Sequence, residues 1–390
     1  MHDVTEFNVD LEKTYNGDVT SCCVYHAGRK NSMETNRPKF TRKTILLPFV
    51  GLAAFFLYIL LFNVDIPDII ATAGRADPII YSAAVLFGFA EIFFYAVSWQ
   101  TILSALKVKI SVMRAFLYVS YGIFMDIIIP AESISGEICR IYLVNREQCG
   151  TSGKTVASVI TQRILGMGIN VVVLLLGIIF LFDTAQINPL IFNMIVLFTG
   201  AITFILLALL LLSWKENWSL RIINILMRVG EFLSRGKWKQ KFASLKDETL
   251  KAMKIFHYSM KEFAHKPKML VLPTFLLTLN WISSLAVPYL VFLSLGYPIS
   301  WTAIFITSSI VVAVKSIPIG IPFEVGLPEI TMTTLYTSMG VPAGISATST
   351  ILSRIITLWL RFGVGFAAQQ WTELRPVPTP SNGNSVVQKP

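Results

Sequence analysis

The sequence is poor in charged side chains. Asp, Glu, Lys and Arg together make up 14% of its 390 residues, whereas soluble domains contain about 25%. Hydrophobic residues make up 54%, and several of their uninterrupted blocks reach about 20 residues, the length that crosses a hydrocarbon core of roughly 30 Å. A soluble fold would lack a polar shell, so the composition predicts a polytopic membrane protein.

Residues that build metal sites and disulfide frameworks are also scarce. The chain has four cysteines and four histidines, and no cysteine stands at a metal-ligand spacing from a histidine. The histidines all lie outside the apolar blocks, and no HExxH motif, P-loop or GxGxxG motif is present. We therefore expect no cofactor, no metal and no enzymatic activity. The net charge of +10 lies in the loops, which favours cytoplasmic loops near anionic lipids over a nucleic-acid partner.

The apolar blocks predict six spanning helices and two shorter, broken segments. One short block, near 115–129, stops at PAESISGE, and another, near 301–317, stops at PIGIPFEVGLPE. The Lys/Arg bias of the loops predicts that each is a re-entrant hairpin, the first entering from the cytoplasm and the second from outside. The expected fold is an all-α polytopic membrane protein. Its spanning blocks cover residues 45–64, 78–106, 154–182, 189–212, 269–295 and 345–371.

Polar segments divide the chain into parts. Residues 1–43 predict a basic cytoplasmic tail, 44–372 a transmembrane domain, and 373–390 a disordered cytoplasmic tail. Between the two halves of the transmembrane domain, residues 214–268 contain 13 Lys and Arg against 5 Asp and Glu. Their apolar residues recur at helical spacing, which predicts a cytoplasmic amphipathic segment on the membrane surface. We expect a cell (plasma) membrane protein with both termini in the cytoplasm.

An internal repeat relates the two broken segments. PAESISGE and PFEVGLPE each place one carboxylate two residues after a proline and another seven residues after it. A lone arginine follows the second carboxylate by 26 residues in the first copy and by 25 in the second. Opposite entry of the two hairpins makes this an inverted repeat, a frequent plan in transporters. The residues are Glu132, Glu137 and Arg163 in repeat one (about 78–213), and Glu324, Glu329 and Arg354 in repeat two (about 269–372).

Ionisable side chains inside a membrane are costly, so each is a candidate site residue. We predict that the two hairpin tips meet and that arginines bind a lipid phosphate through paired hydrogen bonds. One alternative is that Glu137 and Glu329 form ion pairs with the following arginines that only fix the helices. The predicted substrate-binding residues are Glu132, Glu137, Arg140, Arg163, Lys315, Glu324, Glu329, Arg354 and Arg361.

Several of these residues have a second interpretation. Glu132 and Glu324 are candidate proton carriers or stabilise the N-terminus of their own half-helix. Arg140 either binds cargo or extends to the inner interface. Arg361 lies seven residues after Arg354, which predicts the same helix face. Outside this set, Asp126, Glu91 and Asn280 are expected to accept or donate hydrogen bonds inside the helix bundle.

The hairpin motifs resemble a known family. PAESISGEICRIYLV followed by ASVITQRILGMGIN, and PIGIPFEVGLPEITMTTLYTSMGVP followed by LSRIITLWLRFGVG, are similar to the transmembrane family of the lysylphosphatidylglycerol synthase/flippase. The resemblance covers roughly residues 45–372. Its matched positions are Pro130, Gly136, Glu137, Arg140, Arg163, Pro318, Gly320, Gly326, Glu329 and Arg354.

The resemblance implies a membrane lipid as partner and movement of its headgroup between leaflets. No aminoacyl-transferase domain accompanies the region, and the second hairpin is poorer in glycine than the family pattern, so the cargo stays open between an anionic or aminoacylated phospholipid and a polyprenyl-linked phosphate. An alternative is a non-catalytic membrane partner of a lipid-modifying enzyme or glycosyltransferase, and a third is a lipid-phosphate enzyme. A homodimer is a further possible assembly.

Overall fold

The computed structural model describes five of the six apolar spanning blocks that the sequence predicts, at least in large part, and each of them is helical. The first block (45–64) and residues 1–43 lie outside the described part, as does the tail beyond Leu374. No strand occurs among the described residues. The structure describes residues 66–129, 134–148, 150–183, 189–215, 239–315 and 326–374, together with positions 217, 218, 221 and 225.

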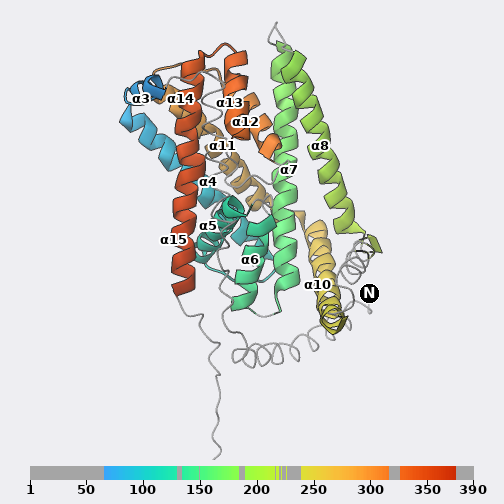
Figure 1. Ribbon diagram of the computed structural model, residues 1–390. Coiled ribbons are helices and arrows are strands. Elements are labelled where there is room, and N and C mark those ends of the chain that lie inside the picture. Colours follow the sequence, from blue (N-terminus) through green and yellow to red (C-terminus); the bar gives the residue numbers. More distant parts are fainter. Residues whose placement is uncertain are drawn as a thin grey trace, which may run out of the picture.

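The helices fall into two groups with the same order of long and short elements (Figure 1). The first group has α4 (Pro78–Ala105), α5 (Val112–Ile128), α6 (Ile134–Glu147) and α7 (Ser152–Asp183). The second has α11 (Val271–Ser294), α12 (Trp301–Lys315), α13 (Leu327–Ser338), α14 (Ala343–Arg354), a π-helical segment (Ile355–Leu360) and α15 (Arg361–Leu374). The others are α3 (Ile66–Ala73), α8 (Pro189–Trp214), α10 (Lys239–His265) and a short 3₁₀ helix (Pro267–Leu270).

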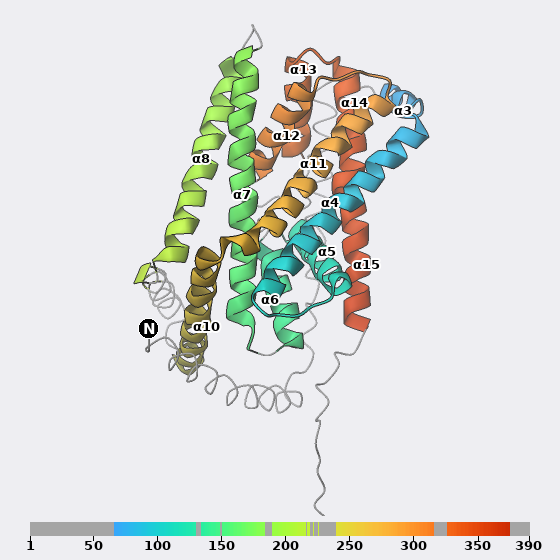
Figure 2. The same cartoon turned by 180° about the vertical axis from the view of Figure 1, so that it is seen from behind.

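Among the described residues, four helical stretches are long and apolar enough to cross a membrane. They carry at most two charged residues in their most apolar 18-residue windows, as a bilayer core requires. Figures 1 and 2 show the short helices α5 and α6 in the lower half and α12 and α13 in the upper half. The four stretches are Pro78–Ala105, Ser152–Val173, Pro267–Ser294 and Ala343–Leu374.

The central packing of the molecule is an antiparallel pair, α4 against α11. Asp77 begins α4 as its N-cap, where its carboxylate accepts hydrogen bonds from Ile79 N (2.8 Å) and Ile80 N (3.2 Å). The Asp77 backbone N–H donates to Ser294 O at the end of α11 (2.8 Å). At the other end of α4, Ser98 Oγ donates to Pro273 O (3.2 Å). These bonds hold the first long helix of one group along that of the other.

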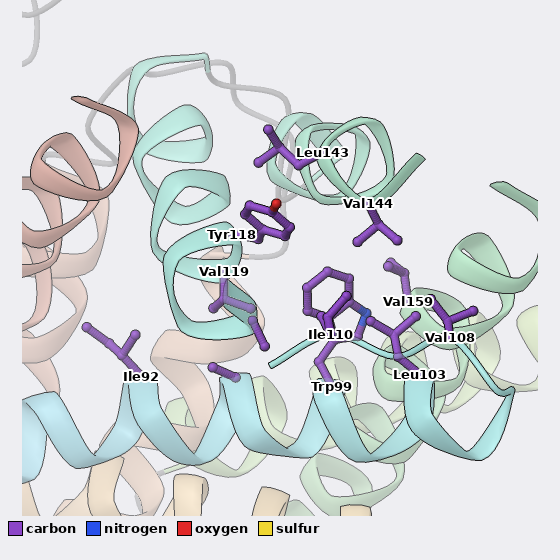
Figure 3. Packing of buried hydrophobic residues seen from close by; sticks show 12 residues of the cluster. Ile92, Trp99, Leu103, Val108, Ile110, Tyr118, Val119, Leu143, Val144 and Val159 are labelled. Carbon is purple, nitrogen blue, oxygen red and sulfur yellow. The ribbon is translucent and has the colours of Figure 1, made fainter. Parts of the chain in front are cut away.

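A buried apolar cluster joins α4, α5, α6 and α7 (Figure 3). Trp99 is fully buried at its centre, and its indole N–H donates to Ser158 Oγ (3.0 Å). The buried polar atom of this large side chain therefore has a partner, as buried indoles normally do. The labelled members are Ile92, Trp99, Leu103, Val108, Ile110, Tyr118, Val119, Leu143, Val144 and Val159.

The amphipathic surface helix predicted between the two groups rests on apolar residues near 220–227, most of which lie outside the described part. The described helix α10 packs against α7 through its own apolar side chains, Phe256 and Phe263, which are 6% and 3% exposed. Gly153 at the start of α7 allows this contact, because a Cβ there would lie 2.5 Å from Ala252 O. This part of the segment thus covers protein.

Candidate functional site

The first half-site lies where α6 meets α7. Arg163 Nη1 of α7 donates to Glu137 Oε1 of α6 at 2.8 Å, which is the ion pair that the sequence offered as the alternative to phosphate binding by the arginine. The two side chains are 32% and 18% exposed. Since the pair is partly open, its charged atoms remain accessible to a ligand. We call this arrangement of α5, α6 and α7 around Glu137 and Arg163 half-site one.

The start of α6 is capped from the neighbouring helix α5. Asp126 Oδ1 accepts hydrogen bonds from Ser135 Oγ and from Gly136 N, each at 2.6 Å. A carboxylate at a helix N-terminus satisfies free N–H groups and interacts favourably with the helix dipole. The expectation that Asp126 accepts hydrogen bonds in the interior is therefore confirmed.

Half-site two lies where α13 meets α14. Arg354 Nε donates to Glu329 Oε1 at 2.5 Å, and the two side chains are only 6% and 3% exposed. The other carboxylate oxygen of Glu329 accepts from Gly326 N at 2.7 Å, at the start of α13. Gly326 has φ 104°, a conformation that favours glycine. Glu329 therefore both pairs with the arginine and stabilises its own helix start.

A third ion pair joins the two groups of helices. Arg361 of α15 pairs with Glu91 of α4, and Asn280 of α11 donates to Glu91 O at 2.8 Å. The prediction that Arg361 shares a helix face with Arg354 did not anticipate the π-helical segment between them. Hydrogen bonds from i to i+5 wind the chain differently from an α-helix, and the two arginines reach different elements. Asn280 contributes interhelical hydrogen bonding, as expected.

Arg140 does not extend to an interface. Its side chain is 5% exposed, and its guanidinium carbon lies 5.2 Å from the Trp99 ring centroid and 5.5 Å from that of Tyr95. Its Nη1 donates to Gln162 Oε1 at 3.0 Å, and Gln162 Nε2 donates to Tyr95 O at 2.9 Å. The interfacial interpretation of Arg140 is wrong, because aromatic rings and an amide hold the group inside.

The remaining predicted site residues are not characterised by the structure. Glu132 and Glu324 lie outside the described residues, and Lys315 is the last residue of α12 with an undescribed side chain. Sequence reasoning missed Gln162, Tyr95 and Trp99. Gln162 carried a signal, since an amide next to Arg163 in an apolar helix is costly without a partner.

Comparison with known proteins identifies the region that holds these residues. A family model described as the lysylphosphatidylglycerol synthase TM region matches residues 46–365. The chain belongs to this family. The match spans both half-sites and every predicted substrate-binding residue. The ion pairs of both half-sites therefore lie within the region shared with the family. The chain is thus an integral membrane protein with several apolar helices.

Similar proteins come from three archaea. A UPF0104 membrane protein of Pyrococcus horikoshii is 25% identical over 323 residues, 82% of this chain and 94% of its own length. One from Methanocaldococcus jannaschii is 26% identical over 344 residues, 85% and 95% of the two chains. One from Methanothermobacter thermautotrophicus is 24% identical over 332 residues, 84% and 94%. Each is similar over nearly its whole length, so the likeness includes both helix groups.

Proposed function

We propose that this protein moves a lipid with an anionic headgroup between the two leaflets of a membrane. The main support for the proposal is that each helix group contains an ion pair between a glutamate and an arginine of the following helix. These pairs are Glu137–Arg163 and Glu329–Arg354. Charged groups inside a membrane mark substrate paths, and arginine binds phosphate through two parallel hydrogen bonds. Candidate cargoes are an anionic or aminoacylated phospholipid and a polyprenyl-linked phosphate.

The proposal includes an inverted repeat with six spanning helices and two re-entrant hairpins. Support comes from the order of the helices, α4 to α7 and α11 to α15, and from the position of α5–α6 and α12–α13 in opposite halves of the molecule (Figures 1 and 2). Non-helical backbone at membrane depth is tolerated only where protein buries it or a cavity meets it. The proline-containing stretches of the sequence between these short helices, 130–133 and 316–325, are therefore proposed to line a polar headgroup path.

The proposal places the protein in the cell membrane, with both termini in the cytoplasm, and assigns it no catalytic step. The basic segment 214–268 supports this orientation by the positive-inside rule. Among the described residues, no three or more His, Cys, Asp and Glu side chains gather as metal ligands would. The ionisable groups of the two half-sites instead form ion pairs, an arrangement suited to binding and release of a charged headgroup.

Transport is tested in vesicles that contain the purified full-length protein and a fluorescent phosphatidylglycerol. Dithionite, which bleaches only the outer leaflet, reports how fast the lipid crosses. We expect the wild type to accelerate crossing and Glu137→Gln or Arg163→Ala to lower that rate at least tenfold. Lys266→Gln is the matched control, because Lys266 is 61% exposed and pairs with Glu262 away from both half-sites.

Rates that are the same in wild type, Glu137→Gln and protein-free vesicles would contradict the proposal. A protein that retains a soluble enzyme on purification but never transports lipid would instead act as its membrane partner. Mass spectrometry of the lipids before and after the assay checks for a chemical product, which transport alone does not form.

A further inference from the structure

The two half-sites are chemically unequal at matching positions. Three residues after Glu137 stands Arg140, whereas three residues after Glu329 stands Met332. The residue before Arg163 is Gln162, whereas Ser353 precedes Arg354. A guanidinium and the amide that holds it are therefore present in half-site one only. In half-site two, a thioether and a hydroxyl occupy these positions.

Arg140 is a fixed cation with unused hydrogen-bonding capacity. A guanidinium has five N–H donors, and Arg140 gives one to Gln162 within the described part of the chain. The side chain is 5% exposed, and the carboxylate whose charge it feels, that of Glu137, forms its ion pair with Arg163. A buried charge is unfavourable unless it is well paired, so a guanidinium that shares its carboxylate with a second arginine is suited to an anion that enters and leaves.

The surroundings of Arg140 hold its guanidinium in one orientation. The rings of Tyr95 and Trp99 lie within the roughly 6 Å at which cation–π attraction acts. Trp99 is fixed through Ser158, and Gln162 through Tyr95 O. These hydrogen bonds to Trp99 and Gln162 keep the Arg140 guanidinium in place before a ligand arrives, which reduces the conformational entropy lost on binding.

The neighbouring ion pair, Glu137 with Arg163, can also form further hydrogen bonds. Glu329 uses both carboxylate oxygens for hydrogen bonds, one from Arg354 and one from Gly326 N, whereas Glu137 accepts one hydrogen bond within the described part of the chain, from Arg163. The pair in half-site one is 18% and 32% exposed, against 3% and 6% in half-site two. Half-site one is thus the more open and less saturated of the two.

From these observations we infer that Arg140, held between Tyr95 and Trp99 and bonded to Gln162, is the binding group for a phosphate ester in half-site one. Half-site two is a closed ion pair that takes no phosphate in this state. The inference rests on the proposed function in one respect, that the ester belongs to a lipid headgroup. A free phosphate has the same chemistry, so the test distinguishes the two sources.

Binding is measured by titration calorimetry on the full-length protein in a neutral detergent. The probes are short-chain dihexanoyl phosphatidylglycerol, inorganic phosphate and the neutral dihexanoylglycerol. We expect saturable binding of a phosphate-bearing probe, at least tenfold weaker binding in Arg140→Met, and a smaller loss in Arg140→Lys, which keeps the charge without the planar fork. The tighter phosphate-bearing probe identifies the source of the ester.

Arg114→Met is the matched control for charge. Arg114 is 50% exposed and pairs with Glu147 in the same helix group. We therefore expect the affinity of the Arg114→Met variant for the phosphate probe to stay within about twofold of the wild-type value. Met332→Leu is the control for the equivalent position in half-site two, with the same expectation. Because Trp99 lies beside Arg140, the phosphate probe is also expected to change tryptophan emission in the wild type and not in Trp99→Phe.

Equal affinity of wild type and Arg140→Met for the phosphate probes would overturn the inference, as would equally tight binding of dihexanoylglycerol. If Arg140→Met does not stay monodisperse in size-exclusion chromatography, Arg140→Lys and the Trp99 emission decide. Failure of the proposed function is distinguishable: Arg140-dependent binding without transport in vesicles leaves the phosphate site standing and removes the transporter.

Discussion

At the scale of single residues, burial decides how much an ion pair contributes. Glu329 and Arg354 are 3% and 6% exposed, and removing one partner of a buried pair costs about 3–5 kcal/mol. Glu137 and Arg163 are less buried, at 18% and 32% exposed, so removing one of them leaves a less strongly desolvated charge behind and costs less. We therefore predict that Glu329→Gln lowers the thermal unfolding midpoint in detergent far more than Glu137→Gln. Equal shifts would contradict this reading of the two pairs.

The pair between Glu91 and Arg361 predicts a measurable coupling. It connects α4 to α15 at 11% and 22% exposure, and charged neighbours in such contacts couple by about 0.5–3 kcal/mol. In a double-mutant cycle of Glu91→Gln and Arg361→Gln, measured by chemical unfolding, we expect a coupling above about 1 kcal/mol. Arg146 and Glu373, 3.8 Å apart and 30% and 49% exposed, form the control cycle, whose coupling should stay near zero. Additive effects in both cycles would show that the inner pair contributes nothing.

Residue spacing along the chain predicted some contacts and not others. Glu137 with Arg163 and Glu329 with Arg354 follow from the arginine that comes 25 or 26 residues after each carboxylate, inside the next apolar helix, because each buried charge needs a partner. The aromatic contacts of Arg140 come from α4, another helix, and depend on how α4 and α6 pack. No spacing along one helix contains that information.

At the scale of elements, small residues set how closely α5 and α6 approach. A Cβ added at Gly136 would lie 2.5 Å from Gly122 O and 2.3 Å from Asp126 Oδ2. Gly136→Ala therefore forces the hairpin apart and displaces the cap of α6, and overpacking of this kind typically costs about 1–3 kcal/mol. We predict a lower unfolding midpoint and slower lipid crossing in vesicles.

Gly168→Ala is the control for the glycine substitution. No atom lies within 4 Å of a Cβ built on Gly168 in α7, and alanine favours a helix over glycine by about 1 kcal/mol. We expect unchanged or higher stability and unchanged transport. If Gly136→Ala behaves like Gly168→Ala, the close approach of α5 and α6 is not required for either property.

The long C-terminal helix shows a limit of sequence patterns at this scale. Hydropathy predicted one helix over 345–371, and the structure has one continuous helical stretch, Ala343–Leu374, but with an unpredicted π-helical segment between α14 and α15. A π-helical segment needs no proline or glycine, and IITLWL contains neither. Its presence follows from tertiary contacts on either side, with Arg354 bound to α13 and Gly365 packed against Ser120 O and Phe124 of α5.

At the scale of the whole molecule, the sequence predicted an all-helical membrane protein better than it predicted how the helices pack. Apolar block lengths and two proline breaks define the long and short helices. The antiparallel contact of α4 with α11 joins residues far apart in the sequence, such as Asp77 and Ser294, which are 217 positions apart. The hydropathy pattern does not predict this pairing. Both helices are apolar on most sides, so neither has a single apolar face that would indicate its partner.

The orientation of the molecule in the membrane gives the last prediction. Figures 1 and 2 place α10 toward one end and α14 toward the other, and Ala264 of α10 and Ala343 of α14 are exposed. The positive-inside rule puts the basic end in the cytoplasm. In intact cells, a membrane-impermeant maleimide should therefore label Ala343→Cys and reach Ala264→Cys only after the membrane is permeabilised. The background for both variants replaces the native cysteines with serine: Cys22, Cys23, Cys139 and Cys149.

The reverse labelling pattern would invert the topology. Labelling of both positions in intact cells would place the two ends on one side of the membrane, which contradicts hairpins that enter from opposite faces.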